Sequence, residues 1–172
     1  FVAQYDTVSS ERAWLTAIGE GSSNHYRASS ADIGPDGNIH VVGHFEESEG
    51  SWHLFVAKLD PTGEIMWEET FPTRHPLKAD HQDIVVTDDG SIYFSGEIGS
   101  VRNPPSDDRS GLPEEEGAFV GRLTSEGEPQ WFGLAVGGSY PIESYGTGVA
   151  VDSDGNVYLS GTTQSTDVVP EE

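Results

Sequence analysis

The sequence predicts an all-β fold built from repeated four-stranded antiparallel units, and three observations support this prediction. A segment with Asp-Gly, a β-branched residue and a second glycine recurs three times, at residues 36–43, 89–96 and 154–161. A second segment, which begins with Phe-Val and precedes a tryptophan by twelve or thirteen residues, also occurs three times. No stretch has a sustained helical period. Because regular self-similarity indicates a repeat architecture, the two recurring segments decide the fold class.

Each unit divides into four short strands. Strand A precedes the Asp-Gly pair, and strand B follows it through a hairpin in which glycine supplies the positive φ angle. Strand C is the Phe-Val segment, and strand D contains the tryptophan. The A strands are predicted at residues 31–33, 84–86 and 149–151, the B strands at 38–43, 91–96 and 156–161, and the C strands at 1–6, 55–60 and 119–124. The structural residues of the repeat are the hairpin glycines Gly37, Gly90 and Gly155, the strand B glycines Gly43, Gly96 and Gly161, and the strand D residues Trp14, Trp67 and Trp131.

Four-stranded antiparallel units of about this length are typical of β-propeller blades. The strand order along the chain is CD, ABCD, ABCD, AB, which is three blades' worth. Within one segment, residues 1–172, we expect a half blade at 1–30, blades at 31–78 and 79–142, and a half blade at 143–172. The connections between strands B and C are predicted at residues 46–53 and 99–117, and the second, an acidic insertion, is predicted to be a surface loop.

A closed propeller typically needs 4 to 8 blades, so three blades' worth is not expected to close a ring. The chain is therefore expected to be part of a larger propeller or assembly. The partners would be further blades of the same protein or other protein chains. With a second copy, the half blades would complete each other in a six-bladed ring or in an open filament.

Three segments carry a resemblance to a known family. Residues 134–139 (Leu-Ala-Val-Gly-Gly-Ser) and residues 148–163 resemble the seven-bladed β-propeller repeat family of bacterial and archaeal secreted and surface proteins. Residues 55–63 resemble the other half of the same repeat. The resemblance covers nearly the whole chain and implies an extracytoplasmic propeller without catalytic residues common to the family. The second unit departs from the pattern at residues 71–73 and 86–88.

The composition excludes several classes of function. The chain carries 30 Asp and Glu against 8 Lys and Arg, a net charge of -22, which disfavours binding to nucleic acids and to anionic membranes. The absence of cysteine excludes disulfides and thiolate sites. No apolar run approaches the roughly 20 residues that a membrane span needs, so membrane insertion is not expected. We expect an extracellular or cell-surface location, where the charge keeps the protein soluble.

One segment suggests a metal. Asp152, Asp154 and Asn156 alternate around a glycine turn as in the first half of a calcium loop, but Thr163 stands where the bidentate Glu of position 12 would be. A hairpin turn is the favoured interpretation, and calcium is the one cofactor that stays open. His40 and His44 lie at i and i+4 on one strand face, where packing is favoured over metal binding because Tyr replaces His40 in the other copies.

No pattern typical of a catalytic site is found, so no catalytic residue is predicted. Trp52, in a B to C connection with no equivalent in the repeat, is the aromatic side chain to examine for ligand contact, although packing within the loop is the favoured interpretation. The predicted function is a non-catalytic extracellular scaffold or a module that interacts with protein or glycan. Two alternatives stay open: a structural subunit of a surface filament or layer, and a fragment of a propeller enzyme acting on polysaccharide.

Overall fold

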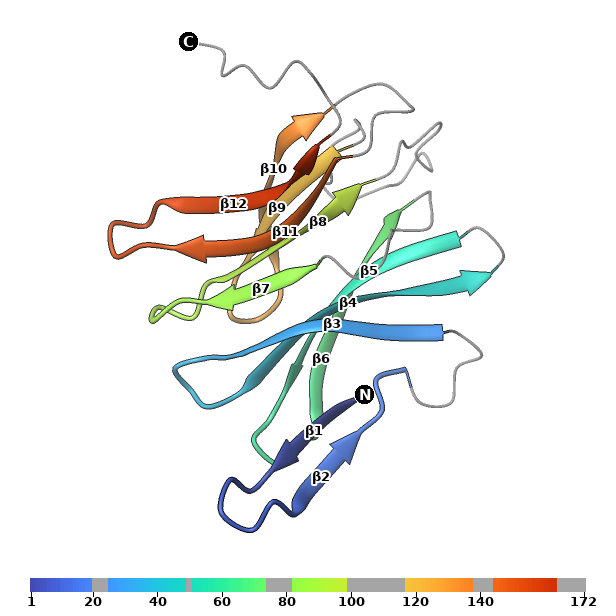
Figure 1. Ribbon diagram of the computed structural model, residues 1–172, viewed down its shortest axis with the longest axis vertical. Coiled ribbons are helices and arrows are strands. Elements are labelled where there is room, and N and C mark those ends of the chain that lie inside the picture. The colour runs from blue at the N-terminus through green and yellow to red at the C-terminus, as the bar shows by residue number, and fades with distance from the viewer. Residues whose placement is uncertain (20–24, 49–50, 74–81, 99–116, 138–143, 164–172) are drawn as a thin grey trace.

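The computed structural model describes residues 1–19, 25–48, 51–73, 82–98, 117–137 and 144–163. Across these residues, the chain forms twelve strands in four antiparallel sheets, which follow one another through the molecule as in a fan (Figure 1). No helix in these ranges is long and apolar enough to cross a membrane. The all-β prediction is confirmed.

Two of the sheets have four strands and two have only two, which is the predicted order CD, ABCD, ABCD, AB. The first four-stranded sheet contains β3 (His25–Ile33), β4 (Ile39–Ser48), β5 (Ser51–Leu59) and β6 (Ile65–Thr73). The second contains β7 (Asp83–Val86), β8 (Ile92–Ile98), β9 (Gly117–Leu123) and β10 (Pro129–Gly137). The two-stranded sheets are β1 (Val2–Tyr5) with β2 (Arg12–Thr16), and β11 (Ser144–Val151) with β12 (Val157–Thr163).

The turns between strands A and B share one geometry. Gly37, Gly90 and Gly155 have φ angles of 79°, 81° and 83°, as the sequence predicts for the hairpin glycines. In each turn the glycine N–H donates to the carbonyl three residues before it, which closes a tight loop with a bulge. The first C–D turn lacks glycine, and Ser10 adopts a φ of 60° there. The repeat is therefore expressed in the backbone as well as in the sequence.

One predicted loop is wrong. Residues 46–53 were expected to connect strands B and C, whereas β4 continues to Ser48 and β5 begins at Ser51. Trp52 lies within β5, where it pairs with Glu46 on one side and Thr73 on the other. Backbone pairing with two neighbours extends the hairpin despite its polar side chains. Apart from Gly117, the acidic insertion at 99–117 lies outside the described residues.

The apolar core lies between successive sheets. One cluster joins the first sheet to the β1–β2 end, and the other joins the two four-stranded sheets. Neighbouring residues of one strand serve different clusters, because alternate side chains point to opposite faces. Val41 belongs to the first cluster and Val42 to the second. The second cluster contains Val42, Leu54, Val56, Phe71, Ile84, Ile92, Phe94, Phe119 and Leu123. This face-to-face stacking is the arrangement of propeller blades.

Candidate functional site

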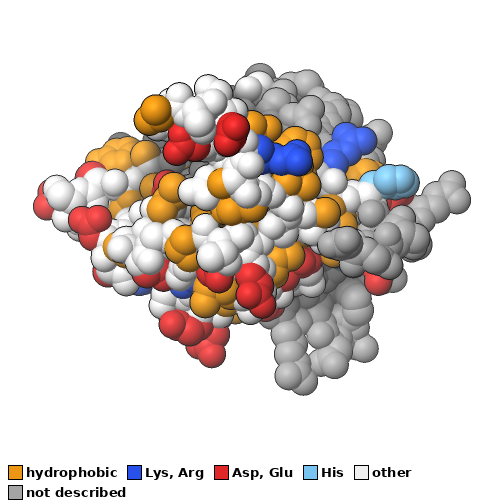
Figure 2. Space-filling view, turned by 90° about the horizontal axis from the view of Figure 1, so that it is seen from below, with side chains coloured by type: hydrophobic (Ala, Val, Ile, Leu, Met, Phe, Trp, Pro, Cys, Tyr) orange, Lys and Arg blue, Asp and Glu red, His pale blue; other side chains and the backbone are white. Residues whose placement is uncertain are grey.

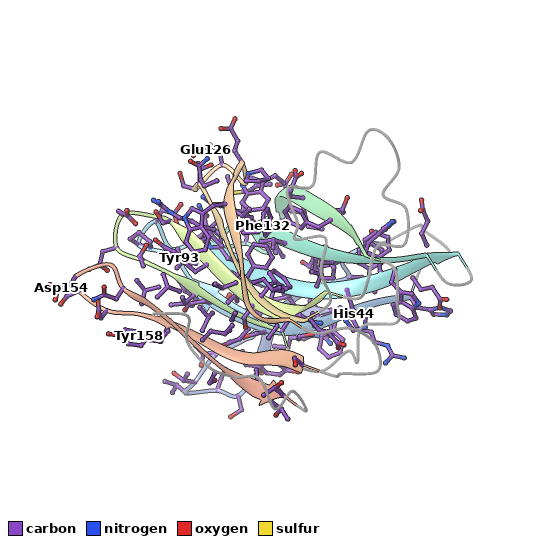
Figure 3. All side chains as sticks on the ribbon, turned by 90° about the horizontal axis from the view of Figure 1, so that it is seen from above. His44, Tyr93, Glu126, Phe132, Asp154 and Tyr158 are labelled. Carbon is purple, nitrogen blue, oxygen red and sulfur yellow. The ribbon has the colours of Figure 1, made fainter. Side chains whose placement is uncertain are left out.

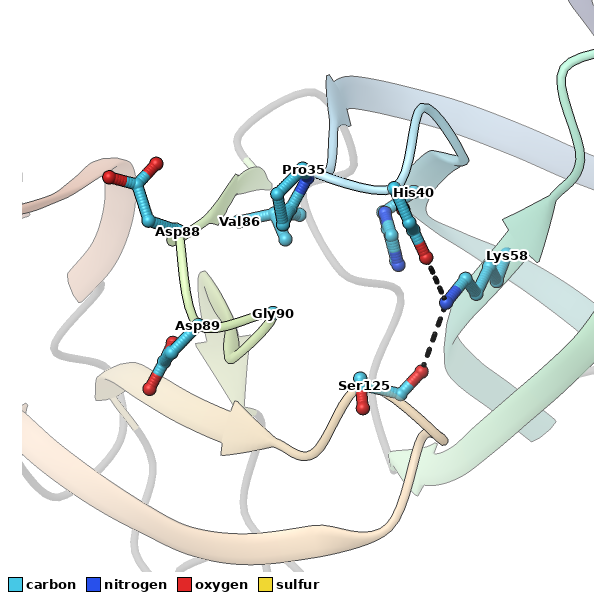
Figure 4. Close-up of a pocket in the computed structure, with 9 residues that line it drawn as sticks. Pro35, His40, Lys58, Val86, Asp88, Asp89, Gly90 and Ser125 are labelled. Atoms are coloured by element: carbon cyan, nitrogen blue, oxygen red, sulfur yellow. Dashed lines mark hydrogen bonds and ion pairs between the residues drawn. The ribbon is translucent and has the colours of Figure 1, made fainter.

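A cavity of about 220 Å³ lies between the two four-stranded sheets, on the face that carries the tight turns (Figure 4). The A–B turns of both sheets, strands β4, β5 and β7, and one C–D turn contribute to its wall. The lining residues are Pro35, Asp36, His40, Lys58, Val86, Asp88, Asp89, Gly90 and Ser125. The lining includes a lysine ammonium group, an imidazole and three carboxylates. These ionisable groups make the cavity the candidate functional site on this face.

Lys58 ties the two sheets together. Its buried Nζ lies 2.9 Å from Asp36 Oδ2, in the A–B turn of its own sheet. It also donates to the Ser125 carbonyl of the next sheet, at 3.4 Å (Figure 4). The hydrogen bond from Lys58, with those from Asn38, lowers the pKa of Asp36 to about 2. The charges of Lys58 and Asp36 are therefore paired with each other, and Lys58 also links the first sheet to the second.

His40 is buried, and its ring points into the cavity (Figure 4). Burial lowers the pKa of His40, and the positive charge of Lys58 lowers it further. The ring meets Trp67 edge-on at a centroid distance of 6.2 Å, and Nδ1 is buried without a hydrogen-bond partner among the described residues. The imidazole is therefore neutral at pH 7 and packs against the core.

The calcium candidates occupy a turn in which the carboxylate is already bonded. Asp152 Oδ1 accepts from the backbone N–H of Asp154 and Asn156, and Oδ2 accepts from the Asn156 amide and the Tyr158 hydroxyl. These bonds lower the pKa of Asp152 to about 2. Among residues that the structure describes, no group of three His, Asp or Glu side chains could hold a metal ion. The bonding supports the hairpin interpretation of this segment.

A second cavity, of about 520 Å³, repeats the first between β7–β8 and β11–β12. Tyr93 stands at the repeat position of His40, and Arg122 at that of Lys58. The Arg122 guanidinium lies 5.7 Å from the centre of the Tyr93 ring and donates to Ser91 Oγ at 2.9 Å. The same place between blades thus holds different chemistry in the two units.

The three tryptophans of the repeat do not have equal surroundings. Trp14 donates its indole N–H to the Pro61 carbonyl, and its ring covers Gly63 in the C–D turn of the first sheet. Trp67 covers Gly127 in the C–D turn of the second sheet in the same way. Trp131 has no following C–D turn in the described part of the chain, and 39 % of it is exposed. The D-strand tryptophan is therefore a contact between one blade and the next.

The other predicted residues lie apart from a ligand site. His44 is buried, and its ring centre lies 5.7 Å from that of Trp52, which is half-buried. The sequence argument missed Lys58 and Arg122. A signal was present, because both basic residues occupy one position of the Phe-Val segment in a chain with only 8 Lys and Arg.

Residues 130–167 match the model of the family SBBP, described as a beta-propeller repeat. The match covers most of β10 and all of β11 and β12, so it contains strands D, A and B of successive units. No curated protein matches the chain. Together with the four antiparallel sheets, the match shows a propeller-type repeat fold.

Proposed function

We propose that the chain is a non-catalytic β-propeller scaffold that works outside the cell as an interaction module. One observation carries this proposal: the stacked antiparallel sheets and the beta-propeller repeat at residues 130–167 form a propeller-type scaffold, and in the cavity between the four-stranded sheets Lys58 and Asp36 are paired with each other.

The polar groups support a structural rather than a chemical role. A catalytic acid or base needs a proton that it can exchange near neutral pH. Lys58 and Asp36 are paired with each other, and burial holds His40 neutral. Asp60 and Asp89 accept hydrogen bonds from their own turns, which lower the pKa of both carboxyl groups. The acidic turns therefore stabilise hairpins.

The non-catalytic proposal is tested with the purified chain and a panel of acidic and neutral polysaccharides. We expect no release of reducing ends above a heat-denatured control. His40→Gln and Asp88→Asn are the decisive variants, because both residues line the cavity. Turnover by the unsubstituted chain that either variant abolishes would overturn the proposal in favour of a polysaccharide enzyme.

Retention of the native chain in a polysaccharide-containing gel addresses a glycan partner. Trp131 is the exposed aromatic side chain beside Tyr93, at a ring distance of 6.1 Å. Retention that Trp131→Ala removes would assign the module to glycan, and retention unchanged by the substitution would exclude this tryptophan as the platform.

The extracellular part of the proposal rests on composition. A net charge of -22 without cysteine suits saline surroundings, in which salt screens repulsion between carboxylates. We expect the melting temperature to rise when salt is added. Equal stability with and without salt would count against this habitat.

A further inference from the structure

The cavity between the two four-stranded sheets has an exposed rim and a buried floor. Pro35, Asp88 and Asp89 are exposed, whereas His40 is 2 % and Lys58 7 % exposed. Two buried polar side chains therefore border a space of about 220 Å³. One water molecule takes up roughly 30 Å³ of the liquid. The cavity has room for a ligand several times larger than water.

His40 supplies a hydrogen-bonding atom that nothing on the described part of the chain satisfies. Its ring points into the cavity, and Nδ1 is buried without a partner there (Figure 4). Native proteins rarely leave a buried polar atom unpaired unless a ligand or water takes the place of the partner. Because the imidazole is neutral at pH 7, Nδ1 either donates or accepts, according to the tautomer.

Lys58 supplies a donor at the same cavity. Its ammonium group has three N–H donors. Within the described ranges, Nζ is 2.9 Å from Asp36 Oδ2 and donates to the Ser125 carbonyl at 3.4 Å. The second bond is longer than a typical N–H···O bond, and one N–H has no partner in these ranges. A ligand in the cavity would therefore accept a hydrogen bond from Lys58.

A hydroxyl group satisfies both side chains. It has one donor and two acceptor lone pairs, so it can accept from Lys58 and either donate to His40 Nδ1 or accept from it. An ammonium group only donates, and the charge of Lys58 would repel it. A metal ion is not favoured either, because no group of three His, Asp or Glu side chains in the described residues could hold one.

The surrounding charge favours a neutral ligand over an acidic one. Three aspartates and one lysine line the cavity, which leaves an excess of two negative charges while His40 is neutral. Glu126, at the tip of the β9–β10 turn, points away from the sheets (Figure 3). Acidic side chains also project at the left edge of Figure 2, the side on which the tight turns lie in Figure 1. A carboxylate or phosphate on the ligand would be repelled.

The carbon surface and the size of the cavity suit one sugar ring. The side chains of Pro35 and Val86 offer carbon atoms for the C–H groups of the ring, while the polar floor faces its hydroxyl groups. Pockets for drug-sized ligands begin at roughly 300 Å³, so this smaller cavity would hold a single residue and not a longer oligosaccharide.

We propose that the cavity binds one neutral sugar residue, with a hydroxyl group of the sugar bridging His40 Nδ1 and Lys58 Nζ. This inference rests on the proposed interaction function and names its partner as a glycan. The second sheet has a different pair at the same positions. There Arg122 lies 5.7 Å from the centre of the Tyr93 ring and donates to Ser91 Oγ. Sugar binding is therefore assigned to the His40 and Lys58 pair and not to the repeat in general.

NMR titration of the whole chain with ¹⁵N-labelled histidine tests the site. The probes are the methyl α-glycosides of glucose, galactose and mannose. The His40 signal is identified among those of the 6 histidines by its loss in His40→Phe. We expect a saturable shift of the His40 Nδ1 resonance with at least one glycoside in the millimolar range, as suits so small a ligand. If none of the three moves this resonance, the proposal is overturned and the cavity holds water.

A charged counterpart tests the preference for a neutral ligand. The methyl uronide of the sugar that binds most tightly has the same ring but carries a carboxylate. We expect its affinity at pH 7 to be lower on the order of tenfold, because the carboxylates around the cavity repel it. Equal or tighter binding of the uronide would overturn the assignment to neutral sugars.

Two matched variants locate the binding. His40→Phe keeps a ring but removes Nδ1, and should weaken the glycoside on the order of tenfold, the effect of one lost hydrogen bond. Tyr93→Phe, at the same repeat position of the second sheet, should leave the affinity unchanged. Calorimetric titration measures both, and urea denaturation shows whether each variant is folded. Unchanged affinity in folded His40→Phe would overturn the proposal. Lys58→Met is the second variant of the site and should also weaken binding.

The same titration separates failure of this inference from failure of the scaffold proposal. Methyl glycosides have no reducing end, so hydrolysis would appear in the NMR spectrum as free reducing sugar. Binding with hydrolysis would support the sugar site and overturn the non-catalytic proposal. Neither binding nor hydrolysis would overturn the sugar site and leave the scaffold proposal standing.

Discussion

The two four-stranded sheets have the same strand order and register but differ in the side chains that meet across strands B and C. In the first sheet, Val41 pairs with Ala57, and at the same place in the second sheet Phe94 pairs with Gly121. A larger residue on one strand is thus accompanied by a smaller one opposite. The two sheets therefore share one backbone register, but they divide the side-chain volume differently between strands B and C.

The neighbouring cross-strand pair differs in charge chemistry. His40 pairs with Lys58 in the first sheet, and Tyr93 pairs with Arg122 in the second. Lys58 reaches across to the next sheet, whereas Arg122 lies over Tyr93 and bonds to Ser91 within its own sheet. The first pair therefore joins two blades, and the second stabilises one.

The largest expected effect concerns the apolar residues of this comparison, Phe94 in the second sheet and Val41 in the first. Phe94 is fully buried against Phe71, Phe119 and Phe132, so Phe94→Ala should cost about 3–5 kcal/mol of the free energy of unfolding. Val41→Ala removes less buried area and should cost about 2 kcal/mol. Urea denaturation of both variants measures the difference, and equal losses would show that the second sheet does not depend on its aromatic cluster.

A substitution at Gly121 tests whether the missing side chain there makes room for Phe94 on the opposite strand. A Cβ atom there would lie 2.8 Å from the rings of both Phe94 and Phe132, so Gly121→Ala should cost about 1–3 kcal/mol through overpacking. In a Phe94→Val background, which copies the first sheet, the same substitution should cost less because one of the two rings is gone. A double-mutant cycle measures this coupling, and strictly additive losses would contradict it.

The charged pair should give a smaller effect than Phe94→Ala. Lys58→Met removes the ion pair with Asp36 and the bond to Ser125, and should cost about 1–3 kcal/mol. Arg122→Met is the matched control in the second sheet and should cost less, because its cation contact with the Tyr93 ring is worth roughly 1 kcal/mol. NMR titration supplies a second readout: the pKa of Asp36 should return from about 2 toward 3.8 only in Lys58→Met.

Much of the fold was predictable because the repeat fixes both turns and pairing. The positive φ angles of Gly37, Gly90 and Gly155 follow directly from the Asp-Gly pattern. The extension of β4 and β5 through Trp52 was not predictable, because polar side chains there suggested a loop while backbone pairing decides the structure. Strand length in a hairpin depends on partners that a single segment does not reveal.

The site was less predictable than the fold. Lys58 and Asp36 are 22 residues apart in sequence, and only the stacking of one sheet on the next brings Ser125 beside them. Sequence spacing identifies turn residues, whereas a contact between blades depends on the angle at which sheets stack. The contact of Trp67 with Gly127 has the same origin, because it depends on how the second sheet stacks on the first.

The smallest expected effect concerns the pH dependence of stability. Its test replaces His40 of the first sheet with the tyrosine found at the same position of the second. Burial lowers the pKa of His40 below 6.5, so the unfolded chain binds a proton there before the folded chain does. The contribution of neutral His40 to the free energy of unfolding, present above about pH 6.5, should therefore be lost as the pH falls below this value. His40→Tyr, which introduces the residue of the second sheet, should reduce that loss.

Burial also lowers the pKa of His53, so His53→Phe should reduce the same loss independently, and the double variant should lose less than either single one. Asp36 titrates separately, since its pKa of about 2 places its contribution between about pH 4 and pH 2. Urea denaturation at pH 7.0, 6.0 and 5.0, on the order of one pH unit apart around the ordinary pKa of histidine, resolves the histidine contribution. If His40→Tyr keeps the full loss of stability over this range, folding does not lower the pKa of the His40 imidazole, and the contrast between the two sheets would be one of shape alone.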